Sequence, residues 1–382
     1  MKIVVFLCAI LAISAFTVNA RTVRLADYGT PGDNQDDSAG FQQAVNDLAG
    51  SGGGTLVVGE GIWNLDNGIN MIYPASATSI RISGNKGAII KLDLNEESTF
   101  LAVGNGVQAE LSGLVVLPRK TGQSYDGGYF LRSDYTGQTI IQNCNFFGLR
   151  MKYDLIRTTN TDLIIEKSLF GGIAAGGASI HVVNFGGLTV RDTLFLDYYQ
   201  FGDTYYSKTP YNAGPWIIAE NDSLRPAAAM GSKAVTISNS RFDEGAPTAI
   251  SVRNAPFVDI SDVHVNVSGV TSATGIRLDN VKFSQIRLSE FGYTAAARPA
   301  IVAINNSPFE AVGLRFGNGV YFADSERNIK IYRDKCIECS VVNISVPATE
   351  KTVEAEPASD MKNTGTGKTA ADKLSTQKRE RQ

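Results

Sequence analysis

Six segments of the sequence share the pattern apolar, any, apolar, any, Asn, and they carry many of the side chains that could do chemistry. The segments are Ile156–Asn160, Ile180–Asn184, Ile217–Asn221, Ile250–Asn254, Ile276–Asn280 and Ile301–Asn305. Such alternation is typical of β-strands with one face in a core. The outward positions hold Arg157, His181 and Arg277 in one column, and Glu220, Arg253 and Asp279 in the next. Because stacked strands lie about 4.8 Å apart, we expect Arg157 beside His181 and the second set in one charged column.

Two kinds of chemistry fit these residue types. Elimination beside a sugar carboxylate needs a base and a cation. His181 or a loop tyrosine would be the base, and Arg157, Arg253 or Arg277 would be the cation. Hydrolysis of a glycosidic bond needs two carboxylates, which Glu220 could supply with Asp197, Asp243, Glu244 or Asp279. Neither set forms a recognised motif. The alternative is a surface ladder of ion pairs, which contributes little.

Two long loops interrupt the pattern and are rich in aromatic residues. The first spans residues 197–215, Trp216 begins the strand that follows, and the second spans residues 222–233 and includes Arg225. Aromatic faces can stack on sugar rings, and long loops in a repeat are often functional. The alternative is that the loops fold over the solenoid or contact another subunit. The predicted substrate-binding residues are Tyr198, Tyr199, Tyr205, Tyr206, Tyr211, Trp216 and Arg225.

A second repeat indicates the elements that position these residues. The pattern apolar, any, apolar, any, any, small, any, Phe occurs at Leu163–Phe170, Leu188–Phe195 and Val235–Phe242, with looser copies elsewhere. The last aromatic residue or its substitute falls at positions 146, 170, 195, 242, 265, 291 and 316. Leucine-rich repeats and β-propellers have other patterns or periods. The spacing predicts a parallel β-solenoid in which each Asn ends a strand in the left-handed conformation.

The N-terminal part of the sequence predicts a cap for the open end of this solenoid. A strand leads to the polar turn at residues 27–37, and Ser38 can cap an amphipathic helix that ends near Ala49. This segment resembles the N-terminal motif of the pectate-lyase-like superfamily. The residues that carry the resemblance are Asp27-Tyr28-Gly29, Gly32-Asp33, Asp36-Asp37, Gly52-Gly53-Gly54-Thr55 and Gly61-Ile62-Trp63. The resemblance implies a right-handed parallel β-helix that acts on or binds polysaccharide.

Three catalytic signatures of that superfamily are absent from the sequence. There is no Asp-Asp pair leading a core strand, no Gly-His-Gly and no Asp-Pro-His. Asp36-Asp37 belongs to the predicted capping turn, so we interpret it as structural. The candidate chemistry therefore lies in the columns and the loops.

Composition and the two ends of the chain restrict the remaining classes. A net charge of −3 over 382 residues gives no electrostatic reason to expect nucleic acid, and two His with four Cys argue against a multi-ligand zinc site. Residues 1–20 read as a signal peptide, and no later segment approaches a membrane span. From residue 349 the composition is that of a disordered tail. We expect one β-helix domain at residues 21–348.

The sequence therefore predicts an all-β, right-handed parallel β-helix with an N-terminal capping helix. The predicted function is a secreted polysaccharide lyase acting on an acidic, uronate-containing glycan of pectin or alginate type. A glycoside hydrolase of the same fold and a non-catalytic glycan-binding or attachment protein are the alternatives. No motif indicates a metal site; calcium and a homotrimer are compatible with the fold, but no pattern in the sequence indicates either.

Overall fold

The computed structural model describes residues 21–72, 79–104, 106–120, 125–207, 214–223, 235–243, 248–267 and 274–287, and then only strands between residues 290 and 355. The predicted signal peptide lies outside the described residues, as do Tyr211, Arg225 and Glu244. One short strand, β35 (Val353–Ala355), lies in the range whose composition predicted a disordered tail.

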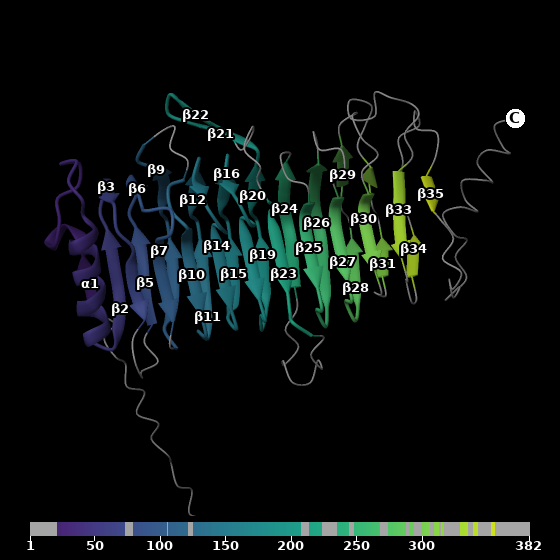
Figure 1. Ribbon diagram of the computed structural model, residues 1–382, viewed down its shortest axis with the longest axis horizontal. Coiled ribbons are helices and arrows are strands. Elements are labelled where there is room, and N and C mark those ends of the chain that lie inside the picture. Colours follow the sequence, from purple (N-terminus) through teal and green to yellow (C-terminus); the bar gives the residue numbers. More distant parts are fainter. Residues whose placement is uncertain are drawn as a thin grey trace, which may run out of the picture.

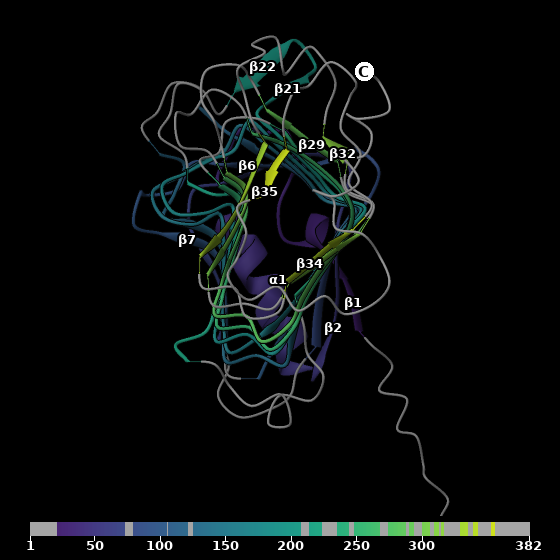
Figure 2. The same cartoon turned by 90° about the vertical axis from the view of Figure 1, so that its right-hand side faces the viewer.

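The described chain is a right-handed parallel β-helix, which confirms the predicted fold class (Figure 1). An eleven-stranded sheet runs along its length and contains β4 (Ile69–Ile72), β7 (Thr99–Gly104), β10 (Tyr129–Asp134), β14 (Ile156–Thr159), β18 (Ile180–Val183), β23 (Ile217–Glu220), β25 (Thr248–Arg253), β27 (Thr274–Asp279), β30 (Ala300–Asn305), β33 (Ile329–Asp334) and β35. Viewed along the axis in Figure 2, the strands surround a common core.

The second sheet has twenty strands and forms the other sides of the helix. Its strands are β1 (Arg21–Arg24), β2 (Gly53–Val58), β3 (Gly61–Leu65), β5 (Ser79–Gly84), β6 (Ala88–Leu92), β8 (Gln108–Ser112), β9 (Val115–Pro118), β11 (Gln138–Gln142), β12 (Asn145–Phe147), β15 (Asp162–Glu166), β16 (Leu169–Gly171), β19 (Leu188–Arg191), β20 (Leu194–Leu196), β24 (Val235–Asp243), β26 (Val258–Val267), β28 (Ser284–Arg287), β29 (Glu290–Tyr293), β31 (Phe309–Val312), β32 (Arg315–Phe316) and β34 (Cys339–Val342). The long strand β24 pairs with both β19 and β20, so one strand in this coil takes the place of two strands in the coil before it.

Two small sheets complete the described strands. The parallel pair β13 (Arg150–Met151) and β17 (Ala174–Ala175) lies in the segment that returns the chain to the eleven-stranded sheet. The antiparallel pair β21 (Tyr198–Phe201) and β22 (Thr204–Ser207) forms a hairpin in the first long loop. A 3₁₀ helix (Leu25–Asp27) and the helix α1 (Ser38–Gly50) precede the coils.

A column of phenylalanines confirms the predicted register of the repeat. Phe146, Phe170, Phe195 and Phe242 pair in successive coils, and the column continues through Val265, Phe291 and Phe316. The four rings are fully buried, with consecutive centroids 5.0, 4.8 and 4.7 Å apart. The core is therefore a stack in which each coil buries its apolar residues against its neighbours.

Left-handed residues make the corners between strands. Asn160, Asn184, Asn254 and Asn280 have φ values between 50° and 55°, which confirms the role predicted for these four asparagines. The prediction is wrong for Asn221, which has no positive φ. A second left-handed column, which the repeat pattern did not predict, follows the next strand and contains Asn143, Lys167, Asp192, Asn239 and Asp262. Where these residues stand, the chain turns sharply without a glycine.

Tyr135 occupies the place of the corner asparagine in an earlier coil. Its φ is 57° and its side chain is 70% exposed, so the ring contributes little packing. An L-residue other than Gly, Asn or Asp loses about 1–2 kcal/mol in this conformation. We expect Tyr135→Asn to raise the free energy of unfolding by about 1 kcal/mol, measured by urea denaturation. An unchanged or lower value would contradict this account of the corner.

One coil departs from the predicted alignment. The Asn-ended pattern aligns Ile276–Asn280 with Ile301–Asn305, but the structure pairs Asp279 with Asn305, a shift of one residue. The sequence contains a second asparagine, Asn306, directly after Asn305, so the pattern fits both registers. A one-residue shift exchanges the inward and outward faces of a strand.

The helix α1 covers the N-terminal end of the solenoid, as predicted. It buries Phe41, Val45 and Leu48, and the Phe41 ring meets Phe100 edge-on with 6.1 Å between centroids. Ser38 is not the capping residue that the sequence predicted, because it is already the first helical residue. Its hydroxyl instead bonds to Asp36 and to the backbone of the following coil.

Candidate functional site

Five side chains on the eleven-stranded sheet and the loop before it are linked across neighbouring coils. We call Asp154, Arg157, His181, Glu220 and Arg253 the charged row. Asp154 Oδ2 accepts from Arg157 Nη1 at 3.0 Å and lies 3.2 Å from His181 Nδ1. His181 Nε2 lies 3.1 Å from Glu220 Oε1, and Arg253 Nη2 donates to Glu220 Oε2 at 2.6 Å.

The pairing of the strands explains this arrangement and confirms the predicted neighbours. Arg157 pairs with His181, and their side chains lie 3.1 Å apart at Nη1 and Nδ1. Glu220, Arg253 and Asp279 follow one another in the next column. Outward positions at the same place in consecutive coils must meet, because parallel strands stack in register.

The charges of the row favour a protonated His181. Burial alone would lower the pKa of His181, but the neighbouring Asp154 and Glu220 outweigh it and raise the pKa. Burial would likewise raise the pKa of Asp154, yet hydrogen bonds from His181, Ala178 and Arg157 lower it. When His181 is protonated, both ring nitrogens can donate to carboxylates, and this form of the ring has no lone pair with which to act as a base.

Stability should depend on pH in the direction that these shifts require. The pKa of folded His181 lies above its ordinary 6.5, so its contribution is complete below pH 6.5 and is lost as pH rises through the folded value. We expect the free energy of unfolding to fall in that range by at most about 1.4 kcal/mol per pH unit, and this part of the slope to vanish in His181→Gln. Urea denaturation between about pH 6 and 9 measures it; an identical slope in the variant would contradict the assignment.

Asp154 is the member of the row that the sequence patterns did not predict. Its side chain is only 4% exposed, and Oδ1 accepts from the backbone N–H of Ala178 at 2.7 Å. Gly177 leaves the space for this carboxylate, since a Cβ there would lie 2.2 Å from Asp154 Oδ1. Its position in the repeat was the available signal. Asp154 lies two residues before the first Ile of its strand, and the next two coils have the uncharged residues Ala178 and Pro215 at that position.

An aromatic pair that the sequence patterns also did not predict lies beside the row. Tyr129 and Tyr153 stack with centroids 5.1 Å apart, and Tyr153 directly precedes Asp154. Tyr153 Oη donates to Glu97 Oε2 at 2.6 Å, and Lys152 pairs with Glu97. Burial, followed by the charge of Asp154, raises the pKa of Tyr129.

The other predicted catalytic residues lie apart from the row or at its end. Arg277 is exposed, and Ile218 and Ser251 separate it from His181 in the same column. Asp279 pairs with Arg253 and so extends the second column. Asp197 is 8% exposed, and Asp243 forms an ion pair with Arg241 at 2.8 Å.

Four of the predicted substrate-binding tyrosines, Tyr198, Tyr199, Tyr205 and Tyr206, lie on the hairpin β21–β22. Tyr198 and Tyr205 point outward, while Tyr199 and Tyr206 belong to the opposite face. Trp216 does not line a binding surface as predicted. It is 1% exposed and packs against Phe195, because the strand β23 begins at the next residue and turns this side chain into the core.

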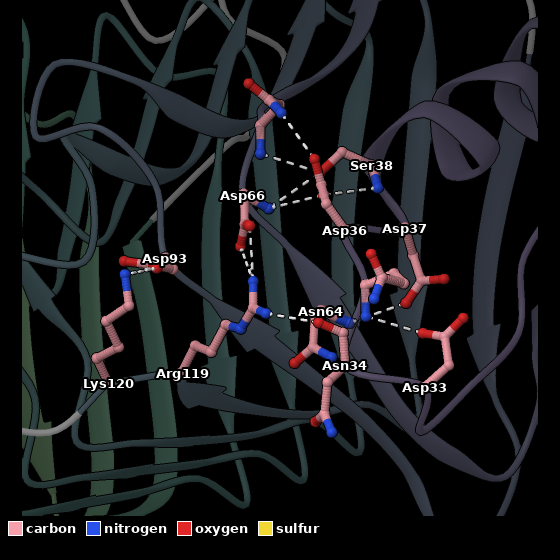
Figure 3. Close-up of polar contacts among 12 residues, drawn as sticks. Asp33, Asn34, Asp36, Asp37, Ser38, Asn64, Asp66, Asp93, Arg119 and Lys120 are labelled. Carbon is pink, nitrogen blue, oxygen red and sulfur yellow. Dashed lines mark hydrogen bonds and ion pairs between the residues drawn. The ribbon is translucent and has the colours of Figure 1, made fainter.

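The acidic residues of the capping turn hold the cap in place (Figure 3). The Asp36 carboxylate accepts from the backbone N–H groups of Ser38 at 3.0 Å and Asp66 at 3.1 Å, and from Asn67 Nδ2 at 2.9 Å. Arg119 binds both oxygens of Asp66 and the carbonyl of Asn34. These contacts agree with the structural interpretation of Asp36-Asp37.

Two further observations concern metals and membranes. Within the described ranges, no group of three or more His, Cys, Asp or Glu side chains is placed to hold a metal ion. No helix in the described part of the chain has the length and apolar character needed to cross a bilayer.

Comparison with solved structures identifies the class of the fold. No protein-family model matches the sequence, and no curated protein matches it. The enzymatically active domain of tailspike protein 2 from bacteriophage CBA120 is 13% identical with a TM-score of 0.51, over 85% of this chain and 47% of that one. DFA-IIIase from Arthrobacter chlorophenolicus A6, in complex with GF2, is 10% identical with a TM-score of 0.51, over 87% and 89%.

A third likeness is the surface adhesin PfbA of Streptococcus pneumoniae, which is 12% identical with a TM-score of 0.48, over 87% of this chain and 100% of that one. The two structures with TM-scores of 0.51 show that this chain has the fold that the N-terminal motif implied, a right-handed parallel β-helix. At these identities the likeness concerns the fold, because one fold supports many activities.

Proposed function

We propose that the protein is a secreted polysaccharide lyase that acts on an acidic, uronate-containing glycan lying across the charged row. The observation that carries the proposal is Glu220, a partly exposed carboxylate held between His181 and Arg253. With His181 protonated, three cations face two carboxylates, so the row keeps one net positive charge that suits an anionic sugar.

In the proposed reaction Glu220 removes the proton on the carbon next to the sugar carboxylate. The electrons of that C–H bond form a carbon–carbon double bond as the glycosidic C–O bond breaks, and water supplies the proton for the leaving oxygen. Arg157 and Arg253 neutralise the charge that develops on the sugar carboxylate. In this scheme His181 is a positioning residue, because it orients Glu220 and does not act as the base.

The exposure of the two carboxylates favours elimination over hydrolysis. Hydrolysis needs two carboxylates that reach the sugar, one as an acid and one as a base or nucleophile. Asp154 is enclosed by Arg157, His181 and the Ala178 backbone, so Glu220 is the one carboxylate of the row that can meet a substrate. Elimination needs one base and nearby cations, which is what the row contains.

Related folds support an enzyme in a general way. One of the similar structures is described as an enzymatically active domain and another as DFA-IIIase in complex with GF2. The predicted signal peptide at residues 1–20 supports export. Every residue of the row comes from one chain, so the proposal does not require a homotrimer.

A second candidate function is glycan binding without turnover. The observation that favours it is that each charged group of the row already has a partner in the row, as in a structural ladder. Ionic partners that only stabilise the coils would leave no group free to exchange a proton with a substrate.

A product assay separates these functions. The mature protein is incubated with uronate and neutral polysaccharides, with and without calcium, and ultraviolet absorbance and reducing ends are measured. We expect unsaturated ends that absorb in the ultraviolet, from uronate polymers alone. New reducing ends without that absorbance would establish a hydrolase instead, and binding without products would leave the binding function.

A further inference from the structure

The hairpin β21–β22 has two different faces. Its pairing places Tyr199, Phe201, Thr204 and Tyr206 on one face and Tyr198, Gln200, Tyr205 and Ser207 on the other. Alternate residues of a strand point to opposite sides, so the four hairpin tyrosines are divided two and two. The burial of the tyrosines follows this division: Tyr198 and Tyr205 are 55% and 63% exposed, while Tyr199 and Tyr206 are partly buried.

The inner face anchors the hairpin on earlier coils. The Tyr199 ring stacks on Phe147 with centroids 4.5 Å apart and an interplanar angle of 9°. Glycines make room for both inner tyrosines, since a Cβ at Gly171 would lie 2.5 Å from Tyr199 and one at Gly148 would overlap the Tyr206 ring. Phe201 adds a second stack on Phe147 at 5.2 Å. The hairpin is thus fixed to the solenoid.

The outer face has the composition of a sugar-binding surface. Tyr198 and Tyr205 lie with centroids 5.8 Å apart and planes 13° from parallel. Between them and beside them are an amide, Gln200, and a hydroxyl, Ser207, and the face carries no charged side chain. Aromatic faces bind the apolar face of a sugar ring, while neutral polar groups bond to hydroxyls.

The hairpin also covers the coils that carry the charged row. Its anchoring residues Phe147, Gly148 and Gly171 belong to the coils of β12 and β16, which continue directly into β14 with Arg157 and β18 with His181. Figure 1 shows β21 and β22 above these coils, at the same position along the axis. The hairpin and the row therefore lie at the same level along the solenoid axis (Figure 1).

We propose that the outer face of the hairpin is a second glycan-binding surface, on which Tyr198 and Tyr205 stack against sugar rings of a polysaccharide. It extends the proposed function, but it requires only binding and no turnover. Because its contacts are uncharged, its affinity should depend little on salt, whereas binding at the charged row should weaken as salt screens it.

The test measures polymer affinity in Glu220→Gln, which removes turnover from the experiment. The probe is polygalacturonate, titrated calorimetrically at low and high salt. We expect Y198A/Y205A in this background to lose about tenfold in affinity, which corresponds to about 1.4 kcal/mol for two stacking contacts. The loss should be the same at both salt concentrations. Tyr205→Trp, which keeps an aromatic face, should retain the affinity.

Tyr135→Asn is the matched control, because it removes an equally exposed tyrosine from another part of the solenoid. It should leave the affinity unchanged, and circular dichroism should show the same fold in all variants. An unchanged affinity in Y198A/Y205A would overturn the proposal even if the wild type proves to be a lyase. Binding that depends on the two tyrosines, with no product from the wild type, would instead overturn the lyase. Failure of the wild type to bind the polymer would overturn both.

Discussion

Glu220→Gln is expected to lower turnover at least about 100-fold, the smallest effect typical of losing a group that transfers a proton. The amide keeps the shape of the side chain, and its oxygen can still accept from His181 or Arg253, but it cannot take a proton from the sugar. The fold and the polymer affinity should change little. Initial rates from ultraviolet absorbance and a separate binding titration measure the two quantities.

Glu166→Gln provides the matched control for this result. Glu166 forms a similar ion pair across neighbouring coils, with Arg191 at 2.7 Å, on the twenty-stranded sheet. Its replacement should leave turnover unchanged. A Glu220→Gln enzyme that keeps its rate would remove Glu220 from the mechanism, and an equal loss in both variants would point to a general effect of breaking cross-coil ion pairs.

Asp126→Asn is expected to stabilise the protein at about pH 8 by up to about 4 kcal/mol and to have little effect near pH 4. Burial raises the pKa of Asp126 to about 7 from its usual 3.8, although the N–H and the charge of Arg150 act in the opposite direction. The carboxyl is 2% exposed, and a tenfold difference in proton affinity between the folded and unfolded chain corresponds to about 1.4 kcal/mol. An asparagine oxygen can still accept from the Arg150 N–H, which lies 2.8 Å away.

Proton binding by Asp126 determines the sign of this effect. Between pH 3.8 and about 7 the folded Asp126 keeps a proton that the unfolded chain has lost, so the free energy of unfolding falls as pH rises. Asp126→Asn should abolish this slope, which urea denaturation from about pH 4 to 8 measures. Asp134→Asn, at an exposed ion pair with Arg132, is the control and should change stability by less than about 1 kcal/mol. A loss of stability in Asp126→Asn at every pH would contradict the prediction.

The architecture could be predicted because the coils repeat a physical requirement. Each coil must bury alternate apolar residues and turn within a narrow cross-section, so Phe170 and Asn160 recur at fixed spacing. The second left-handed column was not predictable, because Lys167 has no preference for that conformation and is held there by the pairing of its neighbours. The adjacent asparagines Asn305 and Asn306 allowed two registers between the last strands, and the local sequence could not decide between them.

The site was predictable only where strands carry it. Arg157 and His181 were expected as neighbours because both occupy outward strand positions in consecutive coils. Asp154 precedes its strand, where no periodicity tells which way a side chain points. Trp216 was misassigned because it stands at the boundary between loop and strand. The division of the hairpin tyrosines required the pairing of β21 with β22, which depends on where the turn falls.

The crystal structure of Glu220→Gln with a bound oligogalacturonate tests the central claim most directly. We expect a sugar chain that crosses the charged row along the solenoid axis, with one carboxylate at Arg157 or Arg253 and the proton-bearing carbon next to residue 220. A chain bound elsewhere on the solenoid, with the row still closed on its own ion pairs, would contradict the account.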